Sequence, residues 1–459
     1  MNLGRKVSHS VFGLCLSAAA VAAGITVPVQ AHAQGMIRDT EVETVLRSYL
    51  NPILGVAGLQ PQAVGLHIIG DPSINAFVSD GQNMFLNTGL IMQLDRPNQV
   101  IGVMAHETGH ITGGHLVRTM QGAKMATIPM LLSMAVGVAA MAAGAGQAGM
   151  GIMMMGQQIA QRSFLAFSRT QEASADQSGL RFLTQTKQSG TGMLEVFKRF
   201  ENQQILLSQK VDPFAQSHPA PVDRIANLQN IVDASPYRDI RDSPASQYAY
   251  DMMRAKLRGY IDRPEATLRR YPASDTSKPA RYARTMANFR LPNMANALVE
   301  IESLLKEEPE NPYFLEMYGQ VNVEMGKVEE GLGPYAKASQ ILPEAALIHV
   351  AFAAAMLGTE NPKYLQAATR QLQTAIATEP DNSFAWHELS VAYARAGNKA
   401  QAELATAERC FSIYALPCAV QFAGRSQRAL PQGSTDWQRA ADIIAISQSQ
   451  MGDQGGRRR

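Results

Sequence analysis

The stretch His106-Glu107-Thr108-Gly109-His110 decides how the first half of this 459-residue chain is interpreted. On a helix, positions i and i+4 lie one turn apart on the same face, so His106 and His110 can bind one metal ion. Glu107 lies beside them, where its carboxylate can take a proton from a metal-bound water. The apolar residues 100–105 lead directly into the motif, which indicates a helix that enters a core. The pattern predicts zinc-dependent hydrolysis.

A catalytic zinc ion needs a third protein ligand and keeps its fourth position for water. His115 is the nearest candidate, but on a continuous helix it lies about 140° round from His110. We therefore expect His115 to point away from the metal and to pack behind the ligands. Glu172 is the better candidate, because it forms an i, i+4 pair with Asp176 on a predicted helix. Glu172 can then reach the metal while Asp176 orients a ligand histidine.

Four motifs in this order and spacing resemble the gluzincin peptidases of the HtpX and CAAX prenyl protease family. They are the segment 75–90, the histidine motif with His115, the segment 168–176, and the segment 217–225. The resemblance covers roughly residues 35–240. It implies one zinc ion per chain with His106, His110 and Glu172 as ligands, Glu107 as general base, and Asp176 as the support of a ligand.

His218 precedes Pro219 in a predicted loop and is followed by Arg224. Peptide hydrolysis requires a donor near the developing oxyanion. We assign this role to His218 and count Arg224 with it and Glu107 as candidate catalytic residues. An imidazole on a loop can instead occupy the open position of zinc and leave the enzyme latent. A loop histidine without a role is the third possibility.

The peptidase part is expected to be mostly helical with a small sheet. A capping-box pattern at Thr40 and Glu43 begins a helix that runs to about Leu54. Residues 64–69 and 83–87 are typical of strands. In zincins the strand before the zinc helix can align an extended substrate by main-chain hydrogen bonds. We therefore predict a substrate edge strand formed by Asn83, Met84, Phe85, Leu86 and Asn87.

Residues 125–160 contain no charged residue and are rich in methionine, alanine and glycine. Three arrangements fit this composition. The first is a hairpin or helix that covers the active site and touches a membrane or an apolar substrate. The second is a buried core hairpin, and the third is a transmembrane span, for which residues 125–145 are long enough. The first is favoured, because the motifs on both sides must assemble on one side of any membrane.

The N-terminus has the features of a secretory signal peptide. Arg5 and Lys6 precede an apolar run, and Ala31-His32-Ala33 offers small residues at a cleavage site, so residues 1–33 are assigned to the signal. An uncleaved membrane anchor is the alternative. Without this segment the 41 basic residues become 39 and equal the 39 acidic residues. A chain of about zero net charge gives no reason to expect nucleic acid as a partner.

Two cysteines remain after the predicted signal, Cys410 and Cys418. In an oxidising compartment such a pair is a candidate disulfide. Neither lies in the histidine motif, which agrees with a catalytic site of histidine and glutamate.

The second half of the chain is predicted to be a helical repeat. Pro309 and Pro343 are 34 residues apart, which is the tetratricopeptide period. Trp386, Leu389 and Tyr393 match the spacing W-x2-L-x3-Y of such repeats. A generic helical bundle is the alternative. The predicted boundaries are 34–240 for the peptidase domain, 241–277 for a linker, 278–425 for the repeats and 426–459 for a C-terminal tail.

The predicted fold class is an α+β, zincin-like peptidase domain followed by an all-α tetratricopeptide solenoid, whose concave surface suits a protein partner. Family members that combine a signal peptide, such a peptidase and such repeats resemble nearly the whole mature chain. That resemblance implies a periplasmic zinc endopeptidase of a Gram-negative bacterium, peripheral to the outer membrane. Its substrates would be unfolded or stalled outer-membrane β-barrel proteins, its partner the β-barrel assembly machinery, and His218 would be a self-inhibiting switch. The alternative is a chaperone or assembly factor that works through its repeats, with a mainly structural metal site.

Overall fold

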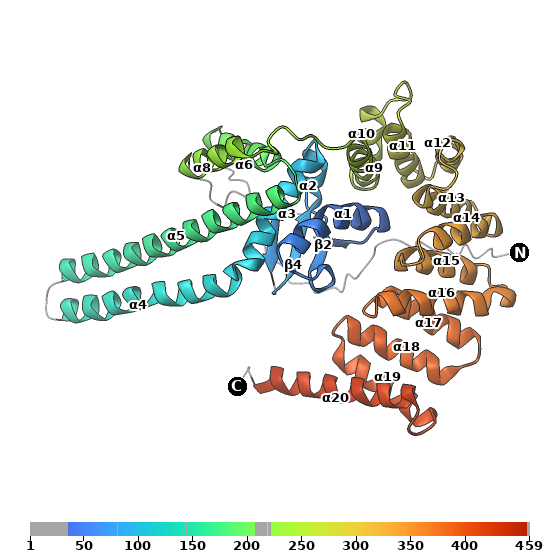
Figure 1. Cartoon of the computed structure of the whole chain (residues 1–459). Helices are drawn as coiled ribbons and strands as arrows, with labels where there is room; N and C mark the ends of the chain where they lie inside the picture. Colours follow the sequence, from blue (N-terminus) through green and yellow to red (C-terminus); the bar gives the residue numbers. More distant parts are fainter. Residues whose placement is uncertain (1–34, 80, 143–145, 207–217, 219–221, 457–459) are drawn as a thin grey trace, which may run out of the picture. The chain divides into compact units, whose positions relative to one another are not determined.

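A computed structural model of the chain describes residues 35–79, 81–142, 146–206, 218 and 222–456. The predicted signal peptide lies outside these residues. Within them the predicted fold class is confirmed. A helical part with a small sheet comes first, and a series of helix pairs follows it (Figure 1).

The sheet has four strands in the order β1-β2-β4-β3. β2 and β4 are parallel, while β1 pairs antiparallel with β2 and β3 pairs antiparallel with β4. Met84 and Leu86 of β4 are buried, and the alternate residues Asn83 and Phe85 are partly exposed, so one face of the sheet packs on the core. The strands are β1 (Met36–Ile37), β2 (Gly65–Ile69), β3 (Ala76–Ser79) and β4 (Asn83–Asn87).

Helices and the sheet of the first part share one apolar core. Asp39 is the N-cap of the first helix, and its side chain accepts a hydrogen bond from the Val42 N–H. The side chain of Glu43 accepts a hydrogen bond from the Asp39 N–H at 3.1 Å. The cap therefore lies one residue before the predicted Thr40. The helices are α1 (Thr40–Val56), the 3-10 helix η1 (Pro61–Ala63), α2 (Thr88–Gln93), α3 (Pro97–Thr112), α6 (Thr191–Leu206) and α8 (Val222–Ala234).

The charge-free segment forms the far part of a two-helix hairpin. α4 (His115–Ala142) and α5 (Gly146–Gln185) run side by side (Figure 1). Many of their apolar side chains are exposed, which contradicts the alternative of a buried core hairpin. Among the described helices, none has the length and apolar character needed to span a membrane.

Residues 241–277, predicted as a linker, are instead helical. They hold α9 (Pro244–Ile261) and α10 (Pro264–Arg270), each with its proline in the first turn. Proline is favoured there because the N–H it lacks has no partner within the helix. The prolines that suggested a linker are therefore helix starts. Tyr250, Met253 and Leu257 of α9 are buried in the same core as α1 and α3.

Helix pairs follow, and they extend beyond the predicted repeat boundary. Gly326 and Gly397 have φ angles of +77° and +75° at the ends of their helices, a conformation that glycine adopts without strain. A disulfide joins Cys410 to Cys418 with a Cα–Cα distance of 5.8 Å. Residues 426–456, predicted as part of a tail, complete the last pair. The pairs are α11 (Lys278–Arg290) with α12 (Met294–Glu307), α13 (Pro312–Glu324) with α14 (Val328–Ile341), α15 (Ala346–Gly358) with α16 (Leu365–Thr378) after η2 (Pro362–Tyr364), α17 (Ser383–Arg395) with α18 (Lys399–Ser412), and α19 (Leu416–Ala429) with α20 (Thr435–Gly456).

Candidate metal centre

α3 and α5 bring the predicted ligands together. α3 is buried from Val100 to His110, so the histidine motif lies inside the core. Gly109 within the motif faces the backbone of α5, and a Cβ atom there would lie 2.6 Å from the carbonyl oxygen of Ala175. Glycine thus permits a close approach of the two helices that any side chain would prevent. This approach places Glu172 beside the two histidines.

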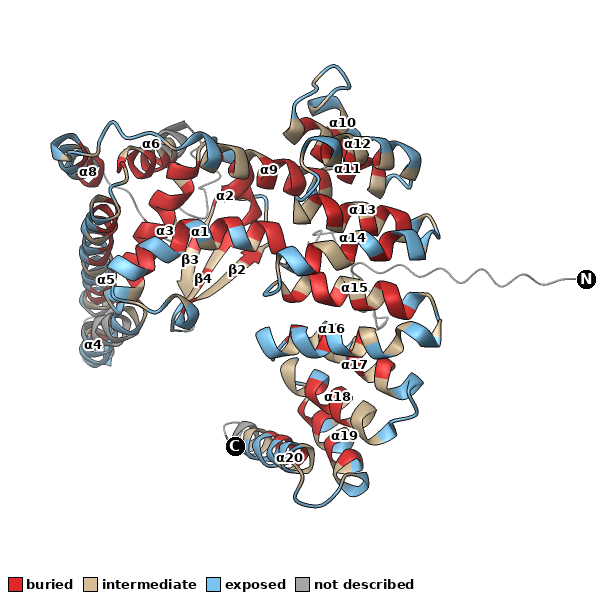
Figure 2. Cartoon of the chain, turned by 45° about the vertical axis from the view of Figure 1, so that its right-hand side comes forward, coloured by how far each residue is buried: buried red, intermediate tan, exposed pale blue. Residues whose placement is uncertain are grey.

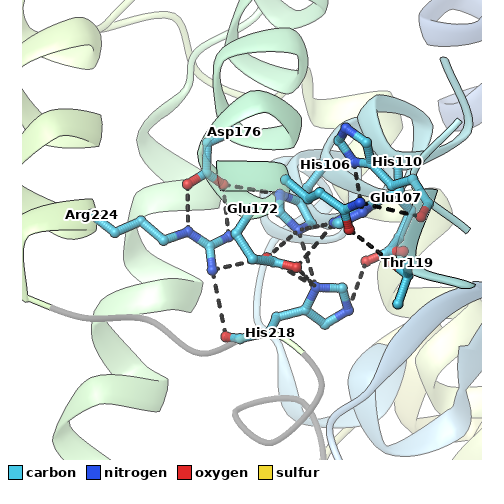
Figure 3. A network of polar contacts seen from close by, with 10 residues as sticks. His106, Glu107, His110, Thr119, Glu172, Asp176, His218 and Arg224 are labelled. Carbon is cyan, nitrogen blue, oxygen red and sulfur yellow. Dashed lines mark hydrogen bonds and ion pairs between the residues drawn. The ribbon is translucent and has the colours of Figure 1, made fainter. Parts of the chain in front are cut away.

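Four buried side chains meet at one point, His106, His110, Glu172 and His218 (Figure 3). Their ligand atoms all lie within 4.8 Å of one another. His106 Nε2 is 3.1 Å from His110 Nε2 and 3.3 Å from Glu172 Oε2. His218 Nδ1 is 3.3 Å from His106 Nε2 and 3.1 Å from Glu172 Oε1. A tetrahedron with metal bonds of about 2.0–2.1 Å has edges of about 3.3–3.4 Å, and the four distances given above are close to this value.

Asp176 and Arg224 hold two of these side chains from behind (Figure 3). Asp176 Oδ1 lies 2.9 Å from His106 Nδ1, which leaves His106 Nε2 toward the other ligands. Arg224 donates to both oxygens of Asp176, at 2.8 Å from Nη2, and its Nη1 lies 3.0 Å from Glu172 Oε2. We predicted Arg224 as catalytic, but its guanidinium binds the carboxylates that position the ligands. Arg224 is therefore a positioning residue.

The pKa values indicate a site suited to a positive charge. Burial lowers the pKa of His106, but its contacts with Asp176 and Glu172 outweigh this effect and raise it to about 9. Burial works to raise the pKa of Glu172, but His218 and the other two histidines bring it well below its usual range. Burial lowers the pKa of His110 to about 3. The carboxylates therefore favour a cation among them.

Glu107 belongs to the same cluster, but it has a charged neighbour in His218 and, among the described residues, no hydrogen bond. Its side chain is fully buried, and within the described part of the chain neither carboxylate oxygen accepts a hydrogen bond. His218 Nε2 lies 3.5 Å from Glu107 Oε1, beyond hydrogen-bond distance. Burial raises the pKa of Glu107. A buried carboxylate without a hydrogen bond is costly for stability, and a raised pKa beside metal ligands suits a general base.

His115 reaches a ligand by a route that the sequence did not predict. α3 ends at Thr112, Gly114 follows with a φ of +60°, and α4 begins at His115. The premise of one continuous helix is therefore wrong. His115 Nδ1 lies 3.1 Å from His110 Nδ1, and His110 turns its Nε2 toward the cluster. His115 thus packs against the back of His110 from the start of a new helix.

The predicted substrate edge strand is also corrected. β4, residues 83–87, pairs with β2 on one side and with β3 on the other, so its backbone groups are used on both sides. Among the described strands the two edges of the sheet are β1 and β3, and β3 is the one that contacts α3. The N–H of Asn87 donates to the carbonyl of Asn75 at 3.0 Å. Along an antiparallel pair of strands, residues that bond to the partner strand alternate with residues whose backbone groups point away from it. The backbone groups of Ala76 and Val78 therefore face the open edge.

Phe197 of α6 was not identified from the sequence. Its ring centroid lies 5.3 Å from that of His106, and the guanidinium carbon of Arg224 lies 4.8 Å from it. Phenylalanine on an amphipathic helix is typical of ordinary core positions, so only the fold reveals this placement. Phe197 fills the space beside a ligand and keeps water from it.

Comparison with known proteins confirms the predicted resemblance. Residues 38–232 match the model of Peptidase family M48, so the chain carries a metalloendopeptidase domain of this family. It is similar to a Vibrio cholerae protein described as "Putative beta-barrel assembly-enhancing protease", at 25% identity over 80% of this chain and 76% of that protein. The Escherichia coli K12 "Beta-barrel assembly-enhancing protease" is 24% identical over 74% of this chain and 69% of its own length. The "Mitochondrial metalloendopeptidase OMA1" of Schizosaccharomyces pombe is 26% identical over 39% of this chain and 50% of its own.

Proposed function

We propose that the chain is a periplasmic zinc endopeptidase that cleaves unfolded or stalled outer-membrane β-barrel proteins and is held latent by His218. The observation that carries this proposal is the buried cluster of four ligand atoms beside Glu107, whose oxygens accept no hydrogen bond within the described residues. The names of the two bacterial relatives, both proteases that enhance β-barrel assembly, support the substrate class.

Each residue of the cluster has a part in this chemistry. His106, His110 and Glu172 would hold zinc, which when bound polarises a peptide carbonyl and lowers the pKa of water. Glu107 takes a proton from the attacking water and returns it to the leaving amine, because within the described residues neither of its oxygens accepts a hydrogen bond. Asp176 fixes the orientation of His106 at 2.9 Å and makes its other nitrogen a better ligand.

The edge of β3 suits an extended polypeptide. Ala76 and Val78 present free backbone groups there, and a substrate strand can pair with them. Main-chain hydrogen bonds of this kind are largely independent of the substrate's side chains. Such recognition favours chains that are unfolded, because folded proteins do not offer an unpaired strand.

His218 accounts for latency. A catalytic zinc site keeps one position open for water, whereas a structural site is closed by four protein ligands. His218 Nδ1, at 3.1 Å from both oxygens of Glu172, takes the place of the fourth ligand. With zinc held there, water and substrate would reach the fourth position only after His218 leaves it. Contacts of a substrate or partner that displace the His218 side chain would activate the enzyme.

The location and partners are proposed from the termini and the repeats. The predicted signal peptide directs the chain to the periplasm, and the disulfide between Cys410 and Cys418 is stable in such an oxidising compartment. The helix pairs offer a surface for a protein partner, and the β-barrel assembly machinery is the partner that fits the proposed substrates.

A second candidate function is favoured by one observation. A site closed by four protein ligands is also what a structural zinc ion requires. The chain would then be a non-proteolytic assembly factor that acts through its repeats. Glu107 argues against this function, because a structural site has no use for a buried carboxylate that accepts no hydrogen bond within the described residues.

Cleavage of a urea-unfolded outer-membrane β-barrel protein tests the proposal. We expect no or slow cleavage by the wild type, fast cleavage by His218→Ala, and none by the double variant His218→Ala/Glu107→Gln, with zinc bound in all three. His387→Ala, at an exposed histidine of α17, is the control and should behave as the wild type.

Two results would contradict parts of the proposal. If the wild type cleaves and His218→Ala does not, His218 is an oxyanion donor and the latch is wrong. If no variant cleaves although zinc analysis shows the site filled, the assembly-factor function is the better explanation.

A further inference from the structure

The α4–α5 hairpin exposes large apolar side chains. Leu131 and Leu132 of α4 are 58% and 62% exposed, and Met154 and Met155 of α5 are 61% and 63% exposed. Figure 2 shows long exposed stretches along α5. Contiguous apolar surface of this kind marks a site of interaction, because water does not solvate it favourably.

The apolar side chains are not confined to one stripe. Successive helix residues are turned by about 100°, so Leu131, Leu132, Met134 and Val136 point to several sides of α4. All four side chains are exposed, although α5 packs along one side of α4. A helical partner that lies along the hairpin would need a single apolar stripe. A lipid phase contacts a hairpin on every free side.

The charges of the same region have one sign. From residue 108 to residue 171 the chain has no aspartate or glutamate, and it has four basic residues. None of the four lies between residues 125 and 161, which form the far part of the hairpin. Arg118, Arg162 and Arg169 are exposed nearer its base. An apolar end with basic residues behind it is the pattern of elements that enter the interface of an anionic membrane.

We propose that the far end of the α4–α5 hairpin docks onto a membrane that contains anionic phospholipids. Its leucines and methionines enter the headgroup and acyl boundary, and the arginines at its base meet the lipid phosphates. α4 begins at His115, which contacts a ligand, and α5 carries Glu172. Docking would therefore hold the metal centre beside the membrane surface. The proposal does not depend on proteolysis.

Flotation with lipid vesicles tests the proposal on residues 36–459, which form a compact unit of their own and lack the apolar N-terminal segment. We expect the protein to float with vesicles of phosphatidylethanolamine and phosphatidylglycerol. Leu131→Ser/Leu132→Ser should lower vesicle partitioning at least about tenfold, because both side chains lose their transfer into the lipid. Val299→Ser/Ile413→Ser is the matched control, since these residues are 65% and 52% exposed on the repeats.

The basic residues give a second arm. Arg162→Gln/Arg169→Gln should lower partitioning to the anionic vesicles by about fivefold for each charge and should not change partitioning to phosphatidylcholine vesicles. The control is Arg263→Gln/Arg409→Gln, at exposed arginines outside the hairpin. Bound zinc and thermal stability should be unchanged in every variant, which separates lost docking from lost folding.

Three results would overturn the proposal. The first is no flotation of the wild type with either vesicle, and the second is equal flotation of Leu131→Ser/Leu132→Ser. The third is a lipid-free dimer in sedimentation velocity that Leu131→Ser/Leu132→Ser disperses, which would make a second copy the occupant. Binding of an unfolded protein through Leu131 and Leu132, without vesicle binding, would likewise assign the surface to substrate.

Discussion

The metal centre and a second buried cluster of charges use similar residues in opposite ways. The second, which we call the junction cluster, consists of Lys256, Asp39, Glu41 and Tyr282, from α9, the start of α1, and α11. Lys256 Nζ lies 2.8 Å from Asp39 Oδ2 and 3.4 Å from Glu41 Oε2. The hydroxyl of Tyr282 donates to Glu41 at 2.8 Å. Each charged group therefore forms an ion pair or a hydrogen bond with a group on another element.

In the metal centre Asp176 and Glu172 are likewise paired with Arg224, but one carboxylate is not satisfied in this way. The ligand atoms of this centre converge on one point, and Glu107 is buried without a hydrogen bond in the described chain. Buried charges that satisfy one another hold elements together, whereas those left unmatched are available for a metal and for proton transfer. The comparison therefore separates an architectural cluster from a chemical one, and substitutions in the two should have different consequences.

The largest effect is expected from Lys256→Met. The substitution leaves Asp39 and Glu41 buried without their cation, which should lower the free energy of unfolding by about 3–5 kcal/mol. Urea unfolding measures it, with Lys306→Met at an exposed lysine as control. Bound zinc should not change in the folded variant. A loss below about 1 kcal/mol would show that the junction cluster behaves as a surface ion pair.

Asp176→Asn should act on the metal rather than on the fold. An amide cannot match the carboxylate that holds His106 and Arg224, so zinc affinity should fall about 10–100-fold. Competition with a zinc chelator measures this, and Asp233→Asn at an exposed position of α8 serves as control. Unchanged zinc affinity would mean that Asp176 supports the fold alone and that the metal centre resembles the junction cluster.

The metal ligands could be predicted because helical spacing is local geometry. His106 and His110 are one turn apart wherever the helix lies, and the same holds for Glu172 and Asp176. The prediction of the edge strand failed because it depends on pairing between distant segments. The order of the strands, which gives the edge to residues 76–79, is set by contacts that no local pattern encodes.

Breaks in helices were the second source of error. The turn at Gly114, which brings His115 behind His110, is hidden in a run that is compatible with one long helix. In the sequence Pro244 and Pro264 suggest a linker, but they begin helices. The approach of His218 to the ligands follows from tertiary packing, and the sequence alone left its role open.

Glu316→Gln should reveal a smaller imbalance next to the junction cluster. Burial raises the pKa of Glu316 to about 7, against the opposing effect of Lys256. The native state then binds the proton more tightly than the unfolded state, so this residue costs stability as pH rises from about 4.5 through 7. The variant should match the wild type near pH 4.5 and exceed it by about 1–2 kcal/mol near pH 8. Urea unfolding at both pH values measures this, with Glu310→Gln as the exposed control. Equal pH dependence of variant and wild type would contradict it.

The smallest effect is a gain of stability in Glu107→Gln. Because burial raises the pKa of Glu107, the charged carboxylate is disfavoured in the native state, and its cost appears as pH rises above the unfolded value. The neutral amide should therefore raise the free energy of unfolding of metal-free protein by about 0.5–1 kcal/mol at neutral pH while cleavage is lost. Thermal unfolding against Glu344→Gln, an exposed control, measures it. Destabilisation by Glu107→Gln would instead mean that the carboxylate is satisfied where it lies. The buried carboxylate of the metal centre would then be satisfied as fully as those of the junction cluster. Glu107 would no longer distinguish the two clusters.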